Sequence, residues 1–311
     1  MKKHLALAMG LLLMAVAMTG CGKSSSLTSS DGTSGGTAVE QAKVNASLSA
    51  DLALVEDEVS EDETPTDFDA GSGGLALVRP YRWWRHITSV NRTFTTEFSD
   101  PDSSGRPTRA LVTVNSTILG TFNVIAGDTA AGDTTRRLIT KPLENHRVRK
   151  LLLVRVHADS AAVDSLRREW RIVGTSGAKV ASVNGVTNIQ NIRVQAGAID
   201  TTITNPLELW RTRRVFFLPP MTQVTVTVTT NSADDLVFLR GFDRRFRFHP
   251  NGDGTYTASW MTGERPMRLQ HFGIEAMSRA TLFDDVAPYD AQAWILPYAP
   301  HRDGCDIEHR R

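Results

Sequence analysis

The stretch Val224-Thr225-Val226-Thr227-Val228-Thr229 decides the fold class of this 311-residue chain. Valine and threonine alternate there with a period of two, so one face of the segment is apolar and the other polar. That alternation predicts a half-buried β-strand. Similar alternating runs occur at 117–124, 245–248 and 255–260. The chain is therefore expected to be built mainly from β-strands.

Turn residues separate these runs, mostly as Asp-Pro, Ser-Gly, Asn-Gly and Asp-Gly pairs, which suit hairpins. Residues 148–156 are more continuously apolar and predict a strand buried on both faces. Residues 158–170 fit either one short helix or a polar loop that leads into a strand. Short strands with frequent turns predict an all-β protein of two packed antiparallel β-sandwich units. We expect them at 81–230 and, in a smaller unit, at 231–300, with a tail at 301–311.

The net charge is distributed unevenly along the chain. Residues 22–80 hold three bases and 11 acids, a net charge of −8, whereas residues 81–311 hold 30 bases and 23 acids, a net charge of +7. The acidic part is rich in Ser, Gly and Thr, and this composition predicts a disordered tether over residues 21–80. Val44, Leu48, Leu52 and Val55 have helical spacing, but a short isolated helix is weak in water. A solvated spacer is the preferred interpretation.

The first residues read as an export signal. Lys2 and Lys3 precede an apolar run from Leu5 to Met18, which is too short to cross a bilayer as a helix but fits a secretory signal. The run ends in Met18-Thr19-Gly20-Cys21, which resembles the lipobox of bacterial lipoproteins, although Met18 stands where Leu is usual. The resemblance implies a signal peptide over residues 1–20, cleavage before Cys21 and acylation of that cysteine. An ordinary signal peptide is the alternative.

This resemblance also implies a location. The protein is expected outside the cytoplasm, attached to a membrane through its lipid anchor. Gly22, rather than Asp, follows Cys21 and favours the outer membrane if the host has two membranes. If Cys21 is lipidated, only Cys305 remains, so an internal disulfide is impossible. For the folded part, the resemblance is to immunoglobulin-like and fibronectin-like sandwiches, a likeness of fold that does not define function.

The best acidic cluster of the folded part is Asp284, Asp285 and Asp290. Paired carboxylates can perform acid–base chemistry or hold Ca²⁺, but a polar loop is the favoured interpretation. His301, Cys305 and His309 could ligate Zn²⁺, yet no established zinc spacing supports this and a frayed tail is favoured. The sequence therefore predicts no metal and no other cofactor.

Arginine beside tryptophan is the other candidate feature, as in Arg82-Trp83-Trp84-Arg85. Such pairs suit acidic sugars, lipid headgroups or nucleic acid. The arginine groups are scattered and no nucleic-acid module is visible, so solvated strand faces are the favoured interpretation and nucleic acid is not expected as a partner.

Three functions follow from these patterns. The first is a membrane-anchored envelope protein with a non-catalytic binding or structural role, with envelope proteins or anionic polymers as partners. The second is a hydrolase that acts on envelope material through the acids at 284–290. The third is a module that binds anionic glycans or lipids. No catalytic signature is present in the sequence, so the first hypothesis is preferred.

Overall fold

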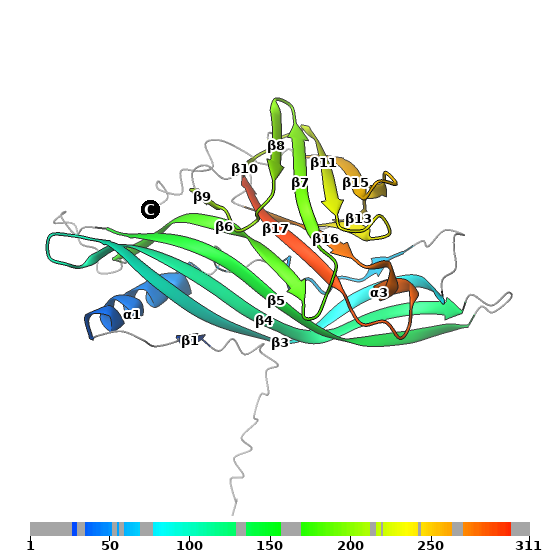
Figure 1. Ribbon diagram of the computed structural model, residues 1–311, viewed down its shortest axis with the longest axis horizontal. Coiled ribbons are helices and arrows are strands. Elements are labelled where there is room, and N and C mark those ends of the chain that lie inside the picture. The colour runs from blue at the N-terminus through cyan, green and yellow to red at the C-terminus, as the bar shows by residue number, and fades with distance from the viewer. Residues whose placement is uncertain are drawn as a thin grey trace, which may run out of the picture.

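The computed structural model describes residues 27–29, 35–51, 55, 59–68, 77–128, 135–156, 169–211, 216–218, 220–241, 244–262 and 270–299. The prediction of an all-β, antiparallel fold is confirmed in outline, because strands predominate and all but two of the described strand pairings are antiparallel (Figure 1). In chain order the elements are β1 (Leu27–Ser29), α1 (Gly35–Ala50), β2 (Thr66–Asp67), β3 (Val78–Pro101), β4 (Pro107–Asp128), β5 (Arg136–Arg155), β6 (Trp170–Ser182), β7 (Ile189–Ala196), β8 (Ile199–Ile203), β9 (Leu209–Arg211), β10 (Phe216–Phe217), β11 (Gln223–Thr230), β12 (Leu236–Gly241), β13 (Arg244–Arg247), β14 (His249–Pro250), β15 (Thr255–Met261), β16 (Gln270–Met277), α3 (Arg279–Phe283) and β17 (Ala291–Ala299).

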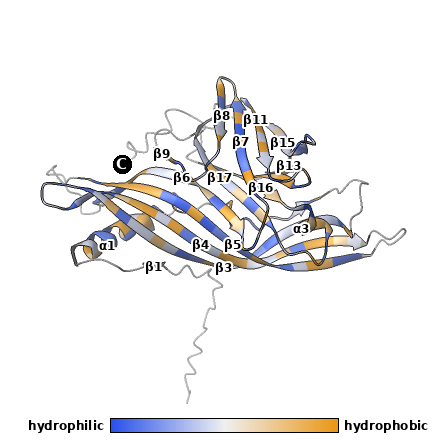
Figure 2. Ribbon diagram, in the orientation of Figure 1, coloured by the Kyte–Doolittle hydropathy of each residue, from blue (hydrophilic) through white to orange (hydrophobic). Residues whose placement is uncertain are grey.

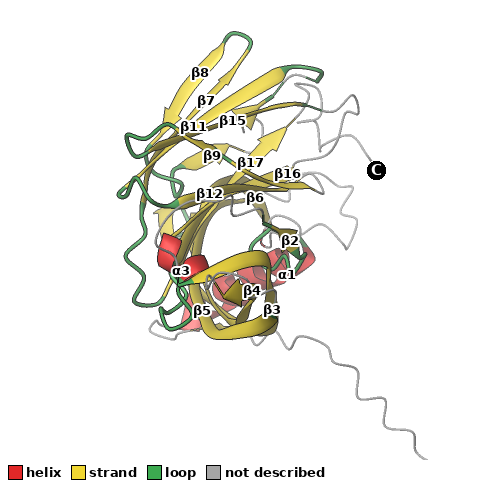
Figure 3. Cartoon of the chain, turned by 90° about the vertical axis from the view of Figure 1, so that its right-hand side faces the viewer, coloured by secondary structure: helices red, strands yellow, loops and turns green. Residues whose placement is uncertain are grey.

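Two sheets face each other across an apolar core (Figure 3). The larger follows the order β1-β3-β4-β5-β6-β17-β16-β12-β13, and the smaller follows β14-β15-β11-β7-β8. Val226 and Ile192 of the smaller sheet bury their side chains in one cluster with Ile274 and Trp294 of the larger sheet. This is the sandwich that the alternating Val-Thr segment predicts, because its valines form one buried face.

Strands β3, β4 and β5 extend well beyond the sandwich as a long, strongly curved sheet (Figure 1). They contain 24, 22 and 20 residues, far more than the usual five or six. Along them, hydrophobic and hydrophilic positions alternate (Figure 2). The inner face of the curve buries two apolar clusters, one around Trp83 and Phe122 and the other around Val112 and Leu151.

The prediction of a disordered tether over residues 21–80 is wrong for the residues of that range that the structure describes. Residues 35–50 form α1, and Val44 and Leu48 bury their side chains against the long sheet and Trp170. Further along, Phe68 packs in the cluster of Trp83. The helical spacing of the apolar residues is therefore a core pattern. Burial against the sheet provides the free energy that an isolated helix lacks.

The strand pairing also crosses the predicted joint between the two units at 230/231. Strand β11 pairs on one side with β7, from the first predicted unit, and on the other with β15, from the second. Strand β6 likewise pairs with β17 near the C-terminus. Residues 231–234 form a turn within the sandwich, because Asn231 binds the backbone of Val186 and Asn188. The described strands of both units thus share one pair of sheets.

Several local predictions can be compared with the structure. The Asp-Pro segment closes the β3–β4 hairpin, and Asn251 begins the turn between β14 and β15, where Gly252 and Gly254 have φ of 88° and 83°. Residues 148–156 lie in and just after β5, but only one face is fully buried, since Leu151 and Leu153 alternate with half-buried residues. Residues 157–168 lie outside the described part. No helix among the described residues is long and apolar enough to cross a membrane.

Replacing Leu48 with alanine should lower the free energy of unfolding by about 2–5 kcal/mol, because it removes a fully buried side chain between α1 and the long sheet. The matched control is Ala46→Ser on the exposed side of the same helix, which should change little. Urea unfolding of both variants measures the difference. Equal midpoints for Leu48→Ala and the parent chain would show that α1 does not pack on the body.

Candidate functional site

Five arginines lie buried inside the curve of the long sheet, each exposed by 5% or less. Along β5, the inward positions run from Leu143, in one apolar cluster, to Leu151, in the other, and the polar residues lie between them. The middle of the inner face is therefore polar while its two ends are apolar. We call this group the arginine belt; its members are Arg85, Arg92, Arg147, Arg149 and Arg240.

The centre of the belt is an ion pair network on three strands. Glu275 on β16 is completely buried and forms ion pairs with Arg85 of β3 and Arg240 of β12, the latter at 3.4 Å between Nη1 and Oε2. Arg85 Nη2 also donates a hydrogen bond of 2.7 Å to the hydroxyl of Tyr289. Burial, together with the nearby charges of Arg85 and Arg245, lowers the pKa of Arg240. The carboxylate of Glu275 offsets part of that cost.

A cavity of about 10 Å³ lies beside this network, with room for one water molecule. Asn145 Oδ1 and the Nε atoms of Arg85 and Arg240 are buried and have no hydrogen-bond partner among the described residues. A water molecule can both donate to Asn145 and accept from an arginine. The volume is far below that of an organic substrate. The lining residues are Ser60, Arg85, Asn145, Val180, Arg240, Glu275, Tyr289, Ala291 and Ala293.

Residues 59–67, which we call the acidic strap, reach into the curve and meet the belt. Asp62 Oδ2 lies 2.7 Å from Arg245 Nη2 and 3.9 Å from Arg240 Nη2. Burial alone would raise the pKa of Asp62, but Arg240, a hydrogen bond from Thr64 and Arg245 outweigh it and lower the pKa to about 2. Arg245 Nη1 also donates to the hydroxyl of Thr66 at 2.7 Å. Ion pairs between the acidic strap and the arginines of the sheet therefore hold the strap in place.

The rest of the strap binds other parts of the interior. Glu61 Oε1 lies 2.6 Å from Arg92 Nη2, and Arg147 Nη1 donates to Ser60 Oγ at 2.6 Å. Glu63 accepts a hydrogen bond of 2.5 Å from the backbone N–H of Ile87, next to the irregularity in β3 between Ile87 and Ser89. Acids of the predicted tether are thus counter-ions of the predicted basic body.

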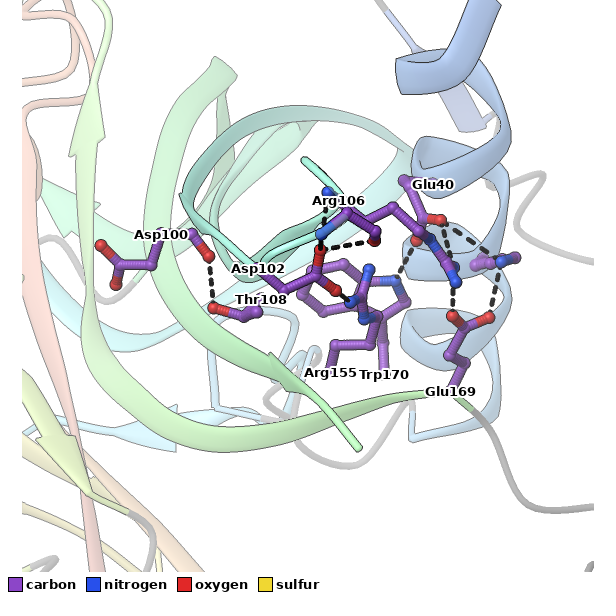
Figure 4. Close-up of polar contacts among 10 residues, drawn as sticks. Glu40, Asp100, Asp102, Arg106, Thr108, Arg155, Glu169 and Trp170 are labelled. Carbon is purple, nitrogen blue, oxygen red and sulfur yellow. Dashed lines mark hydrogen bonds and ion pairs between the residues drawn. The ribbon is translucent and has the colours of Figure 1, made fainter. Parts of the chain in front are cut away.

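A second ionic cluster holds α1 against the end of the long sheet that carries the β3–β4 hairpin (Figure 4). Arg106 Nη2 lies 2.7 Å from Glu40 and 2.5 Å from Glu169, while Lys43 Nζ lies 2.6 Å from the other oxygen of Glu169. Trp170 Nε1 donates to Glu40 Oε2 at 3.0 Å. Hydrogen bonds and ion pairs from these partners hold the pKa of Glu40 below its usual value, although burial opposes this shift.

The β3–β4 hairpin is tied into the same region (Figure 4). Asp102 accepts hydrogen bonds from Ser104 and from the backbone N–H of Arg106, and it forms an ion pair with Arg155 at the end of β5. The hydrogen bond from the Ser104 hydroxyl is the main cause that lowers the pKa of Asp102. The ion pairs and hydrogen bonds of Glu40, Asp102 and Arg106 thus fix the helix and the hairpin.

The three acids that the sequence predicts as a cluster, Asp284, Asp285 and Asp290, make separate contacts. Asp290 is buried and accepts three hydrogen bonds, two of them from the N–H and hydroxyl of Thr187. Asp285 forms a surface ion pair of 2.6 Å with Arg137, and Asp284 accepts from two backbone N–H groups just after it. Among the described residues, no three His, Cys, Asp or Glu side chains are placed to hold a metal ion.

The predicted Arg-Trp run is likewise divided between surface and interior, because neighbouring strand residues face opposite ways. Trp83 and Arg85 are buried, the first in an apolar cluster and the second in the belt. Arg82 is exposed and pairs with Asp67 at 2.6 Å, and Trp84 is half-buried. These four residues therefore do not form one binding surface. Cys21, His301, Cys305 and His309 lie outside the described residues.

A different Arg–aromatic group lies on the outer surface, and sequence reasoning missed it. Arg79 of β3 and Arg136 of β5 both pair with Gly127 of β4, so they flank this glycine across three strands. The ring of Tyr81 lies between them, with its centroid 5.6 Å from the Arg79 guanidinium and 4.4 Å from that of Arg136. Only the strand register brings these residues together, and a single sequence does not give it.

No family model matches this chain, and neither the curated proteins nor the solved structures contain a significant match.

Changing Glu275 to glutamine should lower the free energy of unfolding by about 3–5 kcal/mol, since it leaves two buried arginines without their shared anion. Asp200→Asn is the control, because it breaks an exposed pair with Arg193 and should have little effect. Urea titration of both variants makes the comparison. A loss below about 1 kcal/mol for Glu275→Gln would mean that the network does not hold the interior together.

Asp235 supplies a pH-dependent test of the interior. Its carboxylate is buried, and its Oδ2 has no hydrogen-bond partner among the described residues. Burial raises the pKa of Asp235 from 3.8 to about 6, and the charges of Asp290 and Asp234 add to this effect against a hydrogen bond from Thr230. The folded state therefore binds this proton more tightly than the unfolded state does.

The Asp235 contribution should stabilise the protein below about pH 4 and be lost as pH rises through about 6. The free energy of unfolding of Asp235→Asn, relative to that of the parent chain, should therefore rise by about 1–2 kcal/mol between pH 4 and pH 7. Urea unfolding of both chains across this range gives that difference. A constant difference at all pH values would show that Asp235 titrates normally.

Proposed function

We propose that the protein is a membrane-anchored bacterial envelope lipoprotein with a non-catalytic binding or structural role. The observation that carries this proposal is the leader, in which Lys2 and Lys3, a short apolar run and Met18-Thr19-Gly20-Cys21 follow in that order. Acylated Cys21 would insert its chains into the bilayer, each buried methylene contributing about 0.8 kcal/mol. Gly22 after Cys21 favours the outer membrane where the host has two membranes.

The fold supports a body held close to that membrane. Leu27 begins β1, which pairs with β3 in the long sheet, so only residues 22–26 separate Cys21 from the sheet. A fully extended chain spans at most about 3.6 Å per residue, so the six steps from Cys21 to Leu27 reach about 20 Å. The remaining acidic residues are not a long spacer, because α1 and the strap pack on the body.

The two alternative functions differ in their support. A hydrolase that uses Asp284, Asp285 and Asp290 is less well supported, because each of these carboxylates is engaged in holding a turn or an ion pair. Binding of anionic glycans or lipids has a specific observation in its favour, the exposed Arg79 and Arg136 on either side of the half-buried Tyr81.

Replacing Cys21 with serine tests the anchor. The variant should not be acylated, and it should leave the membrane fraction or keep its leader, as fractionation and mass spectrometry of the mature chain will show. Cys305→Ser is the matched control, because it removes the other cysteine and should leave the protein in the membrane. A Cys21→Ser chain with the same mature mass and the same membrane location as the parent chain would contradict the proposal.

A further inference from the structure

We propose that the outer face at one end of the long sheet contacts the anionic lipid headgroups of the membrane that holds the anchor. This surface, the sheet tip, consists of Leu77, Arg79, Tyr81, Arg136 and Leu138. The inference rests on the proposed lipid anchor at Cys21 and adds a second contact, which would fix how the body lies on the bilayer. Four properties of the sheet tip point to this partner.

The first property is a pre-arranged pair of cations. Because Arg79 and Arg136 are register partners of Gly127 on opposite sides, they project from the same face of the sheet. A Cβ at Gly127 would lie 3.1 Å from the Tyr81 ring, so the glycine lets that ring lie close to the sheet between the two guanidinium groups. A bulge in β3 between Pro80 and Arg82 helps to place the tyrosine there.

The second property is the lack of a counter-ion among the side chains that the structure describes. The adjacent arginines, Arg82 and Arg137, pair with Asp67 and Asp285. Arg79 and Arg136, by contrast, are exposed and form no ion pair with an acid whose side chain the structure describes. Stacking on a tyrosine leaves the guanidinium N–H groups able to donate to phosphate oxygens, which is the geometry that arginine prefers.

The third property is exposed apolar surface on the same face. Leu138 lies two residues after Arg136 in β5 and so shares its outward parity, and Leu77 lies just before β3, two residues before Arg79. Their side chains are 58% and 59% exposed. Leucine beside arginine and tyrosine is the composition of membrane-interface surfaces, where cations meet headgroups and apolar groups enter the acyl boundary. A soluble anion would use the cations but not the leucines.

The fourth property is location relative to the anchor. Strand β1 lies along β3, on the side of the molecule away from the five-stranded sheet (Figure 1). Leu27 pairs with Arg92, thirteen residues along β3 from Arg79, a separation of about 43 Å on a straight strand. A body attached near the middle of β3 and touching the bilayer at the sheet tip would lie along the membrane.

The test uses the mature chain with Cys21→Ser, so that no acyl chain contributes to binding. Co-sedimentation is measured with vesicles of equal parts phosphatidylglycerol and phosphatidylcholine, and with vesicles of phosphatidylcholine alone. We expect salt-sensitive binding to the anionic vesicles, and the pair Arg79→Gln, Arg136→Gln should weaken it about 10- to 30-fold. The control pair Arg193→Gln, Arg211→Gln removes the same charge from exposed positions on β7 and β9 and should weaken it far less.

Two further arms complete the design. Soluble polyphosphate is offered at the same phosphate concentration as the vesicles, and Leu77→Ser with Leu138→Ser should weaken vesicle binding but not any polyphosphate binding. Equal losses in the two arginine pairs, equal binding to neutral vesicles, or polyphosphate binding as tight as vesicle binding would overturn the inference. The melting temperatures should agree among all variants, because the changed side chains are exposed.

This result is separable from that of the anchor. Failure of vesicle binding with normal acylation of Cys21 in cells overturns the sheet-tip contact alone. Normal vesicle binding with no acylation of Cys21 overturns the proposed function and leaves a peripheral membrane contact.

Discussion

The pairing of buried arginines with an acidic strap is the interaction on which the rest of this structure depends. Arg85, Arg147 and Arg240 are almost completely buried, and removing such ions from water costs several kcal/mol each unless anions compensate. One anion, Glu275, comes from the sandwich. Others come from residues 59–67, which lie before the long sheet in the chain. The strap therefore lies against the interior of the curve, with Ser60 and Thr66 buried and Thr64, Pro65 and Asp67 exposed.

The β-strand content of the chain could be predicted because alternation of apolar and polar residues is a local signal. The valines of residues 224–228 are all buried, as the pattern requires. The continuity of the sheets across the predicted joint at 230/231 could not be predicted, because sheet neighbours such as β7 and β15 are distant in sequence from β11 and their pairing is not encoded in any single run. The great length of β3 was also hidden, since bulges at Pro80/Arg82 and Ile87/Ser89 shift the alternation within it.

The packing of α1 and of the strap on the body could not be predicted for a different reason. Low apolar content predicts disorder when a segment is considered alone, but here Asp62 is held by charges and Val44 and Leu48 by the sheet. The signal was present in the opposite net charges of residues 22–80 and 81–311. The run from Arg82 to Arg85 is continuous in the sequence, but alternation along β3 divides its members between surface and interior. The Tyr81 group depends on register and had no sequence signal. For function, β1 begins only six residues after Cys21, so the proposed anchor would hold the long sheet near the membrane.

The coupling energy between Asp62 and Arg245 tests the central claim most directly. Urea unfolding of Asp62→Ala, Arg245→Ala and the double variant closes a double-mutant cycle around the 2.7 Å pair that joins strap and sheet. The account predicts a favourable coupling of about 1–3 kcal/mol that persists at high salt, because the pair is largely buried. A coupling near zero would show that the strap only lies on the surface of the body and that the arginine interior is held together without it.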